Sequence, residues 1–130
     1  MALELFMLGL IVRDMKASVE FYRHLGLAIP EGSEEKTFVE VKMTGMSFFL
    51  NSKPSWDPNY GERAETPITA AGSFGQVLEF NLKEHSAVDA MYAKLVQLGY
   101  RGYREPYAVS SDTRFALVYD PDGNMVLLSA

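Results

Sequence analysis

The stretch LIVRDMKASVEFYRHLGL, residues 10–27, decides the fold, because it holds the end of one element and the whole of the next. It closes an apolar run from Leu3 to Val12 that has the length of a buried strand. Asp14 is a good helix N-cap, apolar residues then recur at helical spacing, and Gly26 stands where a helix C′ glycine belongs. We therefore expect a strand followed by a helix over about Met15 to Leu25.

The residues after this helix predict a short extended piece and a hairpin. Ala28 to Pro30 is expected to be a short strand. The alternating segment from Thr37 to Lys42, the turn Met43-Thr44-Gly45 and the segment from Met46 to Asn51 predict two antiparallel strands. The first part of the chain, about residues 1–52, is thus expected to have the order strand, helix and three strands, βαβββ.

The same order recurs after a connection over residues 53–75, which is rich in Pro, Gly and small polar residues and is expected to lack regular structure. An offset of 73 residues maps Val88 onto Met15 and Gly99 onto Gly26, which indicates an internal duplication. A second βαβββ module is expected over about residues 76–130. At 130 residues the chain has the length of one domain, so we expect both modules to belong to a single domain, 1–130.

The composition excludes several classes of protein. Hydrophobic residues make up 48% and charged residues 22%, a mixture typical of globular domains. Cysteine is absent, which excludes disulfides, thiolate metal sites and a cysteine nucleophile. The net charge is −5 and no segment is a Lys/Arg run, so we expect no nucleic-acid partner. The apolar N-terminus carries Glu4 and is too short to span a bilayer, so we expect a cytoplasmic protein without membrane contact.

Residues 10–27, together with the closing segment VYDPDGNMV at residues 118–126, resemble the vicinal-oxygen-chelate superfamily. This superfamily includes glyoxalase I, extradiol dioxygenases, fosfomycin-resistance enzymes and bleomycin-resistance proteins. The resemblance covers nearly the whole chain. It implies an α+β fold in which two βαβββ modules form an eight-stranded, cup-shaped sheet with the helices on its convex side. In many members a second chain completes the cup, so the resemblance also implies a homodimer.

In the enzymes of this superfamily, four cup-facing positions on the first and last strands of each half hold a metal ion through His and Glu. The corresponding residues here are Met7, Phe49, Val77 and Leu127. None of them is a normal ligand for a hard or borderline divalent ion. The resemblance therefore implies no metal and no other cofactor for this chain. Glu79, two residues beyond Val77, is a further residue expected to face the cup.

Apolar and aromatic side chains are expected to line the cup, because successive residues of a strand face opposite sides of a sheet. A three-residue hairpin loop places Val39 opposite Phe49, and Leu127 is expected opposite Leu117. Aromatic residues of the connections are expected at the rim, where they suit a flat apolar or aromatic ligand. The predicted ligand-binding residues are Met7, Val39, Phe49, Trp56, Tyr60, Glu79, Tyr103, Tyr107, Ser111, Phe115, Leu117 and Leu127.

Within the superfamily the chain is most similar to the metal-free antibiotic-binding proteins of the bleomycin and mitomycin type. The segments Ser55-Trp-Asp-Pro58 and Glu105-Pro-Tyr107 carry this similarity. Such proteins sequester a planar drug and often stack it on an aromatic ring from the segment around residues 107–111. Tyr107 supplies a ring there, whereas Ser111 stands where a larger stacking ring is expected.

Three functional hypotheses follow from the sequence. The first is non-catalytic binding and sequestration of a small planar or aromatic molecule, because no nucleophile–base pair is visible and no catalytic residue is assigned. The second is a lyase, isomerase or dioxygenase of the same fold, with Glu79 and either Glu40 or Asn51 as ligands, or with metal-free acid–base chemistry at Glu79. The third is a protein-interaction module whose cup is only a core.

Overall fold

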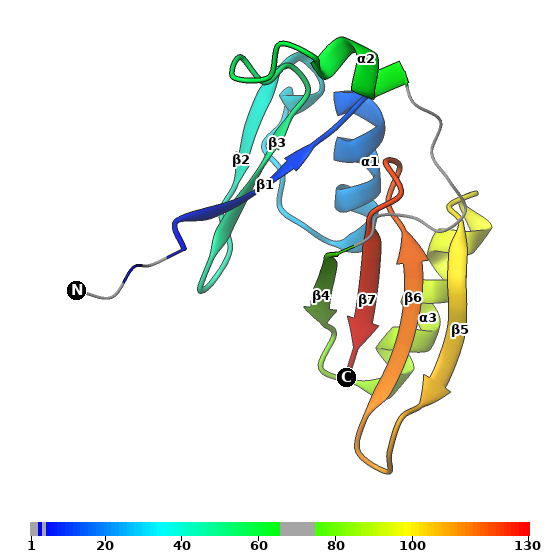
Figure 1. The fold of residues 1–130 in the computed structure, drawn as a ribbon. Helices are drawn as coiled ribbons and strands as arrows, with labels where there is room; N and C mark the ends of the chain where they lie inside the picture. Colours follow the sequence, from blue (N-terminus) through cyan, green and yellow to red (C-terminus); the bar gives the residue numbers. More distant parts are fainter. Residues whose placement is uncertain (1–2, 4, 66–74) are drawn as a thin grey trace. The chain divides into compact units, whose positions relative to one another are not determined.

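The computed structural model describes residues 3, 5–65 and 75–130, and the chain divides into two compact units, Met1–Pro67 and Ile68–Ala130. The unit that contains the N-terminus is called the first unit, and the other the second unit. Each combines one sheet with helices (Figure 1). The first unit contains β1 (Met7–Ile11), α1 (Met15–Leu25), the 3-10 helix η1 (Ser33–Glu35), β2 (Phe38–Val41), β3 (Ser47–Asn51) and α2 (Tyr60–Glu65). The second unit contains β4 (Val77–Asn81), α3 (His85–Gln97), β5 (Gly102–Ala108), β6 (Arg114–Tyr119) and β7 (Met125–Ser129).

The sheet of the first unit has the strand order β1-β3-β2, with β1 parallel and β2 antiparallel to β3. Side chains alternate along these strands, and one face is buried against α1. Tyr22 of α1 contacts Phe48 of β3 across this layer, with ring centroids 5.9 Å apart. The core of the unit therefore lies between α1 and the sheet.

The boundaries of α1 are those that the sequence predicts, Met15 and Leu25. The Oδ1 atom of Asp14 accepts a hydrogen bond from the backbone N–H of Ala17 at 3.3 Å, which satisfies one free donor of the first turn. Gly26 ends the helix in the left-handed region, with φ of 118°, and its N–H donates to the carbonyl groups of Arg23 and Tyr22. Local capping chemistry thus fixes both ends.

The sheet of the second unit has the order β4-β7-β6-β5, and α3 packs against β5, β6 and β7 along one face (Figure 1). Val88 and Leu95 of α3 are fully buried against this face. The turn between β6 and β7 is held by Asp120, whose carboxylate accepts the backbone N–H groups of Asp122 and Asn124 at 2.9 and 2.8 Å. The second unit therefore has the predicted βαβββ order.

The α+β fold of two sheet-and-helix modules is confirmed, with two differences in detail. The described residues contain seven strands, and residues 28–30 form none. The guanidinium of Arg23 donates to the carbonyl oxygens of Ile29 and Pro30, at 3.3 and 2.7 Å, and so occupies acceptors that a strand would use. The expectation that residues 53–75 lack regular structure is wrong at Tyr60–Glu65, which form α2, and residues 66–74 lie outside the described part.

None of the helices among the described residues has the length and apolar composition needed to cross a membrane.

Candidate functional site

Each sheet has a second face, directed away from its helix, which we call the open face. Its residues alternate with the buried ones and are mostly half-buried or exposed. In the first unit the open face comprises Met7, Gly9, Ile11, Phe38, Glu40, Ser47, Phe49 and Asn51. In the second unit it includes Val77, Glu79, Tyr107, Phe115, Leu117, Met125 and Leu127.

The two open faces are built on the same strand register. β1 pairs with β3 in parallel over five residues, with Gly9 beside Phe49. β4 pairs with β7 in the same way, with Glu79 beside Leu127. In each pair the central residue of the first strand meets the central residue of the last. Gly9 and Glu79 are therefore equivalent positions, and Phe49 is equivalent to Leu127.

The central row of the first open face consists of Gly9, Phe49 and Glu40 on β1, β3 and β2. The ring of Phe49 lies over Gly9, since a Cβ atom added at Gly9 would lie 2.1 Å from the Cζ atom of Phe49. Phe38 packs beside Phe49 with ring centroids 5.2 Å apart. A glycine on the edge strand thus makes room for an aromatic cover over this face.

The central row of the second open face consists of Glu79, Leu127, Leu117 and Arg104 on β4, β7, β6 and β5. A carboxylate and a guanidinium therefore stand at the two edges, with two leucines between them. The guanidinium of Arg104 lies 3.5 Å from the ring centroid of Tyr107. This ring is in turn edge-on to Phe115, at 6.1 Å between centroids.

The resemblance assigns the metal-holding positions to Met7, Phe49, Val77 and Leu127, and the structure places all four residues on these open faces. Together they offer one thioether sulfur and no nitrogen or oxygen donor, which does not suit a divalent ion. Within residues 5–65 and 75–130 no group of three or more His, Cys, Asp or Glu side chains is placed to hold a metal ion. The residues present do not fit the metal that the superfamily implies.

The prediction that Val39 lies opposite Phe49 is wrong. Val39 pairs with Leu50, and Glu40 is the residue opposite Phe49. The pairing ends at Val41 and Phe48, so the turn is longer than the expected three residues and the register shifts by one. A shift of one residue exchanges the faces of a strand, which buries Val39 on the helix side. Leu117, by contrast, does pair with Leu127.

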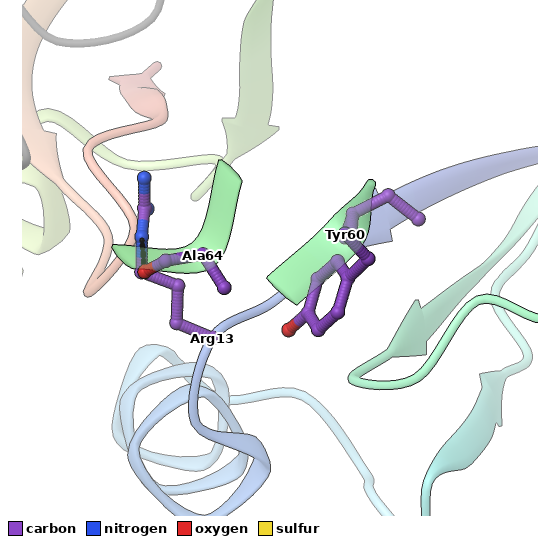
Figure 2. Close-up of a pocket in the computed structure, with 4 residues that line it drawn as sticks. Arg13, Tyr60 and Ala64 are labelled. Atoms are coloured by element: carbon purple, nitrogen blue, oxygen red, sulfur yellow. Dashed lines mark hydrogen bonds between the residues drawn. The ribbon is translucent and has the colours of Figure 1, made fainter. Parts of the chain in front are cut away.

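Tyr60 begins α2, and its hydroxyl donates a hydrogen bond to the backbone carbonyl of Val12. Beside it, the Nε atom of Arg13 donates to the carbonyl of Ala64 at 3.0 Å (Figure 2). Ile11, Arg13, Tyr60 and Ala64 line a shallow pocket of about 70 Å³, the volume of a few water molecules rather than of an aromatic ligand. In this unit Tyr60 fastens α2 to the segment that follows β1.

The remaining rim residues of the sequence-based prediction are exposed. Trp56 precedes α2 with 63% of its surface accessible, and Tyr103 is 58% accessible while edge-on to Tyr119. Ser111 lies in the exposed turn between β5 and β6. Trp56, Tyr103 and Ser111 are therefore accessible to solvent, each in its own unit.

Arg104 is a residue of this face that the sequence pattern did not predict. Simple alternation along β5 would place Tyr103 and Tyr107 on one face and Arg104 on the other. The register of β5 shifts twice, between Gly102 and Arg104 and again between Arg104 and Tyr107. These irregularities place the guanidinium of Arg104 over the ring of Tyr107. No hydrophobic or turn pattern in the sequence predicts them.

Comparison with known proteins agrees with the fold. The family model of the glyoxalase/bleomycin resistance protein/dioxygenase superfamily matches residues 4–128. The hypothetical protein SA1046 from S. aureus is similar, at 18% identity and a TM-score of 0.71, over 100% of this chain and 94% of that one. A glyoxalase/bleomycin resistance protein/dioxygenase family enzyme from Burkholderia phytofirmans PsJN is also similar, at 18% identity and a TM-score of 0.73. The match covers 95% of this chain and 94% of that one. No curated protein matches the chain in sequence.

Proposed function

Because the chain belongs to the glyoxalase/bleomycin resistance protein/dioxygenase superfamily, we propose that it binds a small planar or aromatic molecule without transforming it. One observation carries this proposal. The positions that the resemblance assigns to the metal ligands of superfamily enzymes are Met7, Phe49, Val77 and Leu127, and these residues lie on the open faces. These side chains offer dispersion contacts and apolar surface in place of metal ligands, and such surface is what a binding protein needs.

The surroundings of these positions support binding of an aromatic ligand. Phe38 and Phe49 lie side by side on the first open face, and Tyr107 and Phe115 lie edge-on to each other on the second. Aromatic pairs of this kind contribute about 0.5–1.5 kcal/mol each beyond their burial. A planar ligand that adds one more ring to such a pair gains a contact of the same size.

The biological role that we propose is sequestration, as in resistance proteins of the bleomycin and mitomycin type. Tyr107 supports this role, because its ring lies on the open face beside Phe115. Ser111, in the exposed turn between β5 and β6, offers no ring to stack on, so we propose a ligand gripped mainly at Tyr107. On the resemblance stated above, the binding form is proposed to be a homodimer.

The proposal is tested by two measurements on protein purified without an affinity tag or chelator. Elemental mass spectrometry is expected to find far less than one metal ion per chain, also after divalent ions are added and dialysed away. Isothermal titration with mitomycin C, bleomycin, acridine, 9-aminoacridine and 1,4-naphthoquinone is expected to give a Kd of roughly micromolar for at least one compound. That compound should be recovered chemically unchanged after long incubation.

Variants of the second open face locate the binding. Phe115→Ala is expected to weaken binding by about tenfold, because it removes a ring contact and the apolar area around it. Leu98→Ala is the matched control, since Leu98 is an exposed apolar residue that follows α3. A stoichiometric metal ion that is required for binding, or equal losses in both variants, would contradict the proposal.

A second candidate function rests on Glu79. Its carboxylate stands on an open face beside Leu127, where a bound molecule would meet an acid or base. We therefore keep metal-free acid–base catalysis as the alternative. Its sign would be slow conversion of a bound compound that Glu79→Gln abolishes while the Kd stays the same.

A further inference from the structure

The second open face carries one acidic and one basic side chain in its central row, and their positions give the face a direction. The order across the sheet is Glu79, Leu127, Leu117 and Arg104. Neighbouring strands lie about 4.8 Å apart, so three steps separate the Cα atoms of Glu79 and Arg104 by roughly 14 Å. The apolar floor between the two charges has the width of a small fused-ring system.

The two charges differ in their partners. Arg104 has its guanidinium stacked on the ring of Tyr107 at 3.5 Å. Glu79 is exposed, and among the described residues no hydrogen bond or ion pair engages its side-chain carboxylate. Water therefore solvates the carboxylate in the free protein. Any molecule that covers the leucine floor up to its edge removes part of that water.

We infer that the ligand of the second open face is a planar aromatic cation whose positive charge lies against Glu79; this inference rests on the proposed binding function. Stripping water from a carboxylate is costly unless an opposite charge or hydrogen-bond donors replace it. A neutral aromatic molecule would leave Glu79 desolvated and unpaired. A cationic one replaces the lost water with an ion pair and lays its rings on Leu127 and Leu117.

The basic end of the row fixes the orientation of this cation. Arg104 repels a positive group at the β5 edge, so the charge of the ligand is directed toward β4 and its rings toward Tyr107 and Phe115. The net charge of the chain, −5, favours the approach of cations and disfavours anions. An anion would have to compete with the ring of Tyr107 for Arg104 and would also face Glu79 across the same floor.

The test uses three probes that share one ring system. At pH 7.5, 9-aminoacridine is a cation, acridine is neutral and acridine-9-carboxylate is an anion. Titration calorimetry of the full chain at low salt is expected to rank them in that order, with the cation about tenfold tighter than acridine. Glu79→Gln, which keeps the size of the side chain, is expected to weaken the cation about tenfold and to leave acridine within about twofold.

Two control variants separate a local ion pair from a general charge effect. Glu105→Gln makes the same change in net charge, but Glu105 lines a groove with Tyr92 and Val96 of α3, on the helix side of the sheet. It should leave binding of 9-aminoacridine within about twofold. Arg104→Gln should not weaken the cation at all, because it removes a like charge from the same row.

Three other outcomes would overturn the inference, and each points to a different cause. If cation and neutral probe bind equally and Glu79→Gln changes neither, the face binds planar molecules without charge selection, and the proposed function stands alone. If Glu105→Gln weakens the cation as much as Glu79→Gln, the preference comes from net charge. If neither these probes nor the antibiotics bind, the proposed function fails and the inference fails with it.

Discussion

The two units share a strand register but carry different side chains at equivalent positions of their open faces. In the first, the row Gly9, Phe49 and Glu40 places an aromatic ring over a glycine. In the second, the equivalent places are taken by Glu79, Leu127 and Leu117, so a carboxylate stands on the edge strand and a leucine where the first unit has a ring. The same backbone therefore carries one face that its own phenylalanine covers and one that ends in a free carboxylate. The difference teaches that side chains, not the pairing of strands, set what each face can bind.

The helices of the two units also differ, in the number of side chains that each one buries. α1 buries six side chains, among them Phe21 and Tyr22, whereas α3 buries only Val88 and Leu95. Among the described elements, the main neighbours of α1 are η1 and β3, whereas those of α3 are the strands β5, β6 and β7 of its own sheet. Under the 73-residue offset, the fully buried Phe21 corresponds to Lys94, which is exposed.

The largest expected change in the free energy of unfolding comes from a substitution that tests this contrast between the helices. Phe21→Ala should lower the free energy of unfolding by about 3–5 kcal/mol, because it empties a fully buried aromatic site that Tyr22 contacts edge-on at 4.9 Å. Lys94→Ala, at the equivalent place on α3, should change it by less than about 0.5 kcal/mol. Urea denaturation followed by circular dichroism measures both.

Phe21→Leu serves as the conservative variant and should recover a large part of the lost stability, because it refills much of the cavity. If Phe21→Ala and Lys94→Ala cost the same, then α1 is not packed on two sides and the contrast between the helices is lost.

The elements that the sequence predicts correctly are those specified by nearby residues, through helix caps, apolar spacing and turn motifs. Asp14, the helical spacing and Gly26 gave α1 its observed ends, and the Asp-Pro-Asp-Gly-Asn turn gave the hairpin of β6 and β7. The sequence pattern did not predict the conformation of residues 28–30. The carbonyl oxygens of Ile29 and Pro30 accept hydrogen bonds from Arg23, and this contact is set by tertiary packing. Nor did periodicity indicate α2, a six-residue helix fastened by Tyr60 to the segment after β1.

The next prediction concerns the covered face of the first unit. Gly9→Ala should cost about 1–3 kcal/mol of unfolding free energy, because the new methyl group would overlap the ring of Phe49. The cost should nearly vanish in a Phe49→Leu background, so a double-mutant cycle should show a coupling of similar size. Equal costs of Gly9→Ala in both backgrounds would show that the ring does not depend on the glycine.

The candidate site was predictable where strands are regular. Alternation placed Met7, Phe49 and Leu127 on the open faces, because each lies in a strand without a bulge. It failed at Val39, where a longer turn moved the register by one residue, and at Arg104, where two irregularities in β5 intervene. Turn length and bulges depend on backbone energies that a hydrophobic pattern does not encode.

The smallest expected effect sharpens the comparison at the helix N-termini. Asp14 and Glu84 are both N-cap residues with extended backbone, but only Asp14 accepts a hydrogen bond from its helix. Asp14→Ala should therefore cost about 1 kcal/mol, and Glu84→Ala close to nothing. Glu84→Ser should add about 0.5–1 kcal/mol, because a short hydroxyl side chain can accept a hydrogen bond from the first turn, whereas the Glu84 side chain accepts none.

Amide hydrogen exchange gives this last comparison its residue-level readout. The N–H of Ala17 donates to Asp14, so its exchange should accelerate in Asp14→Ala, whereas Glu84→Ala should leave the first turn of α3 unchanged. An equal loss of stability in the two alanine variants would show that the Asp14 bond contributes nothing. The start of α1 would then be held by its packing rather than by its cap, and Phe21→Ala measures that packing separately.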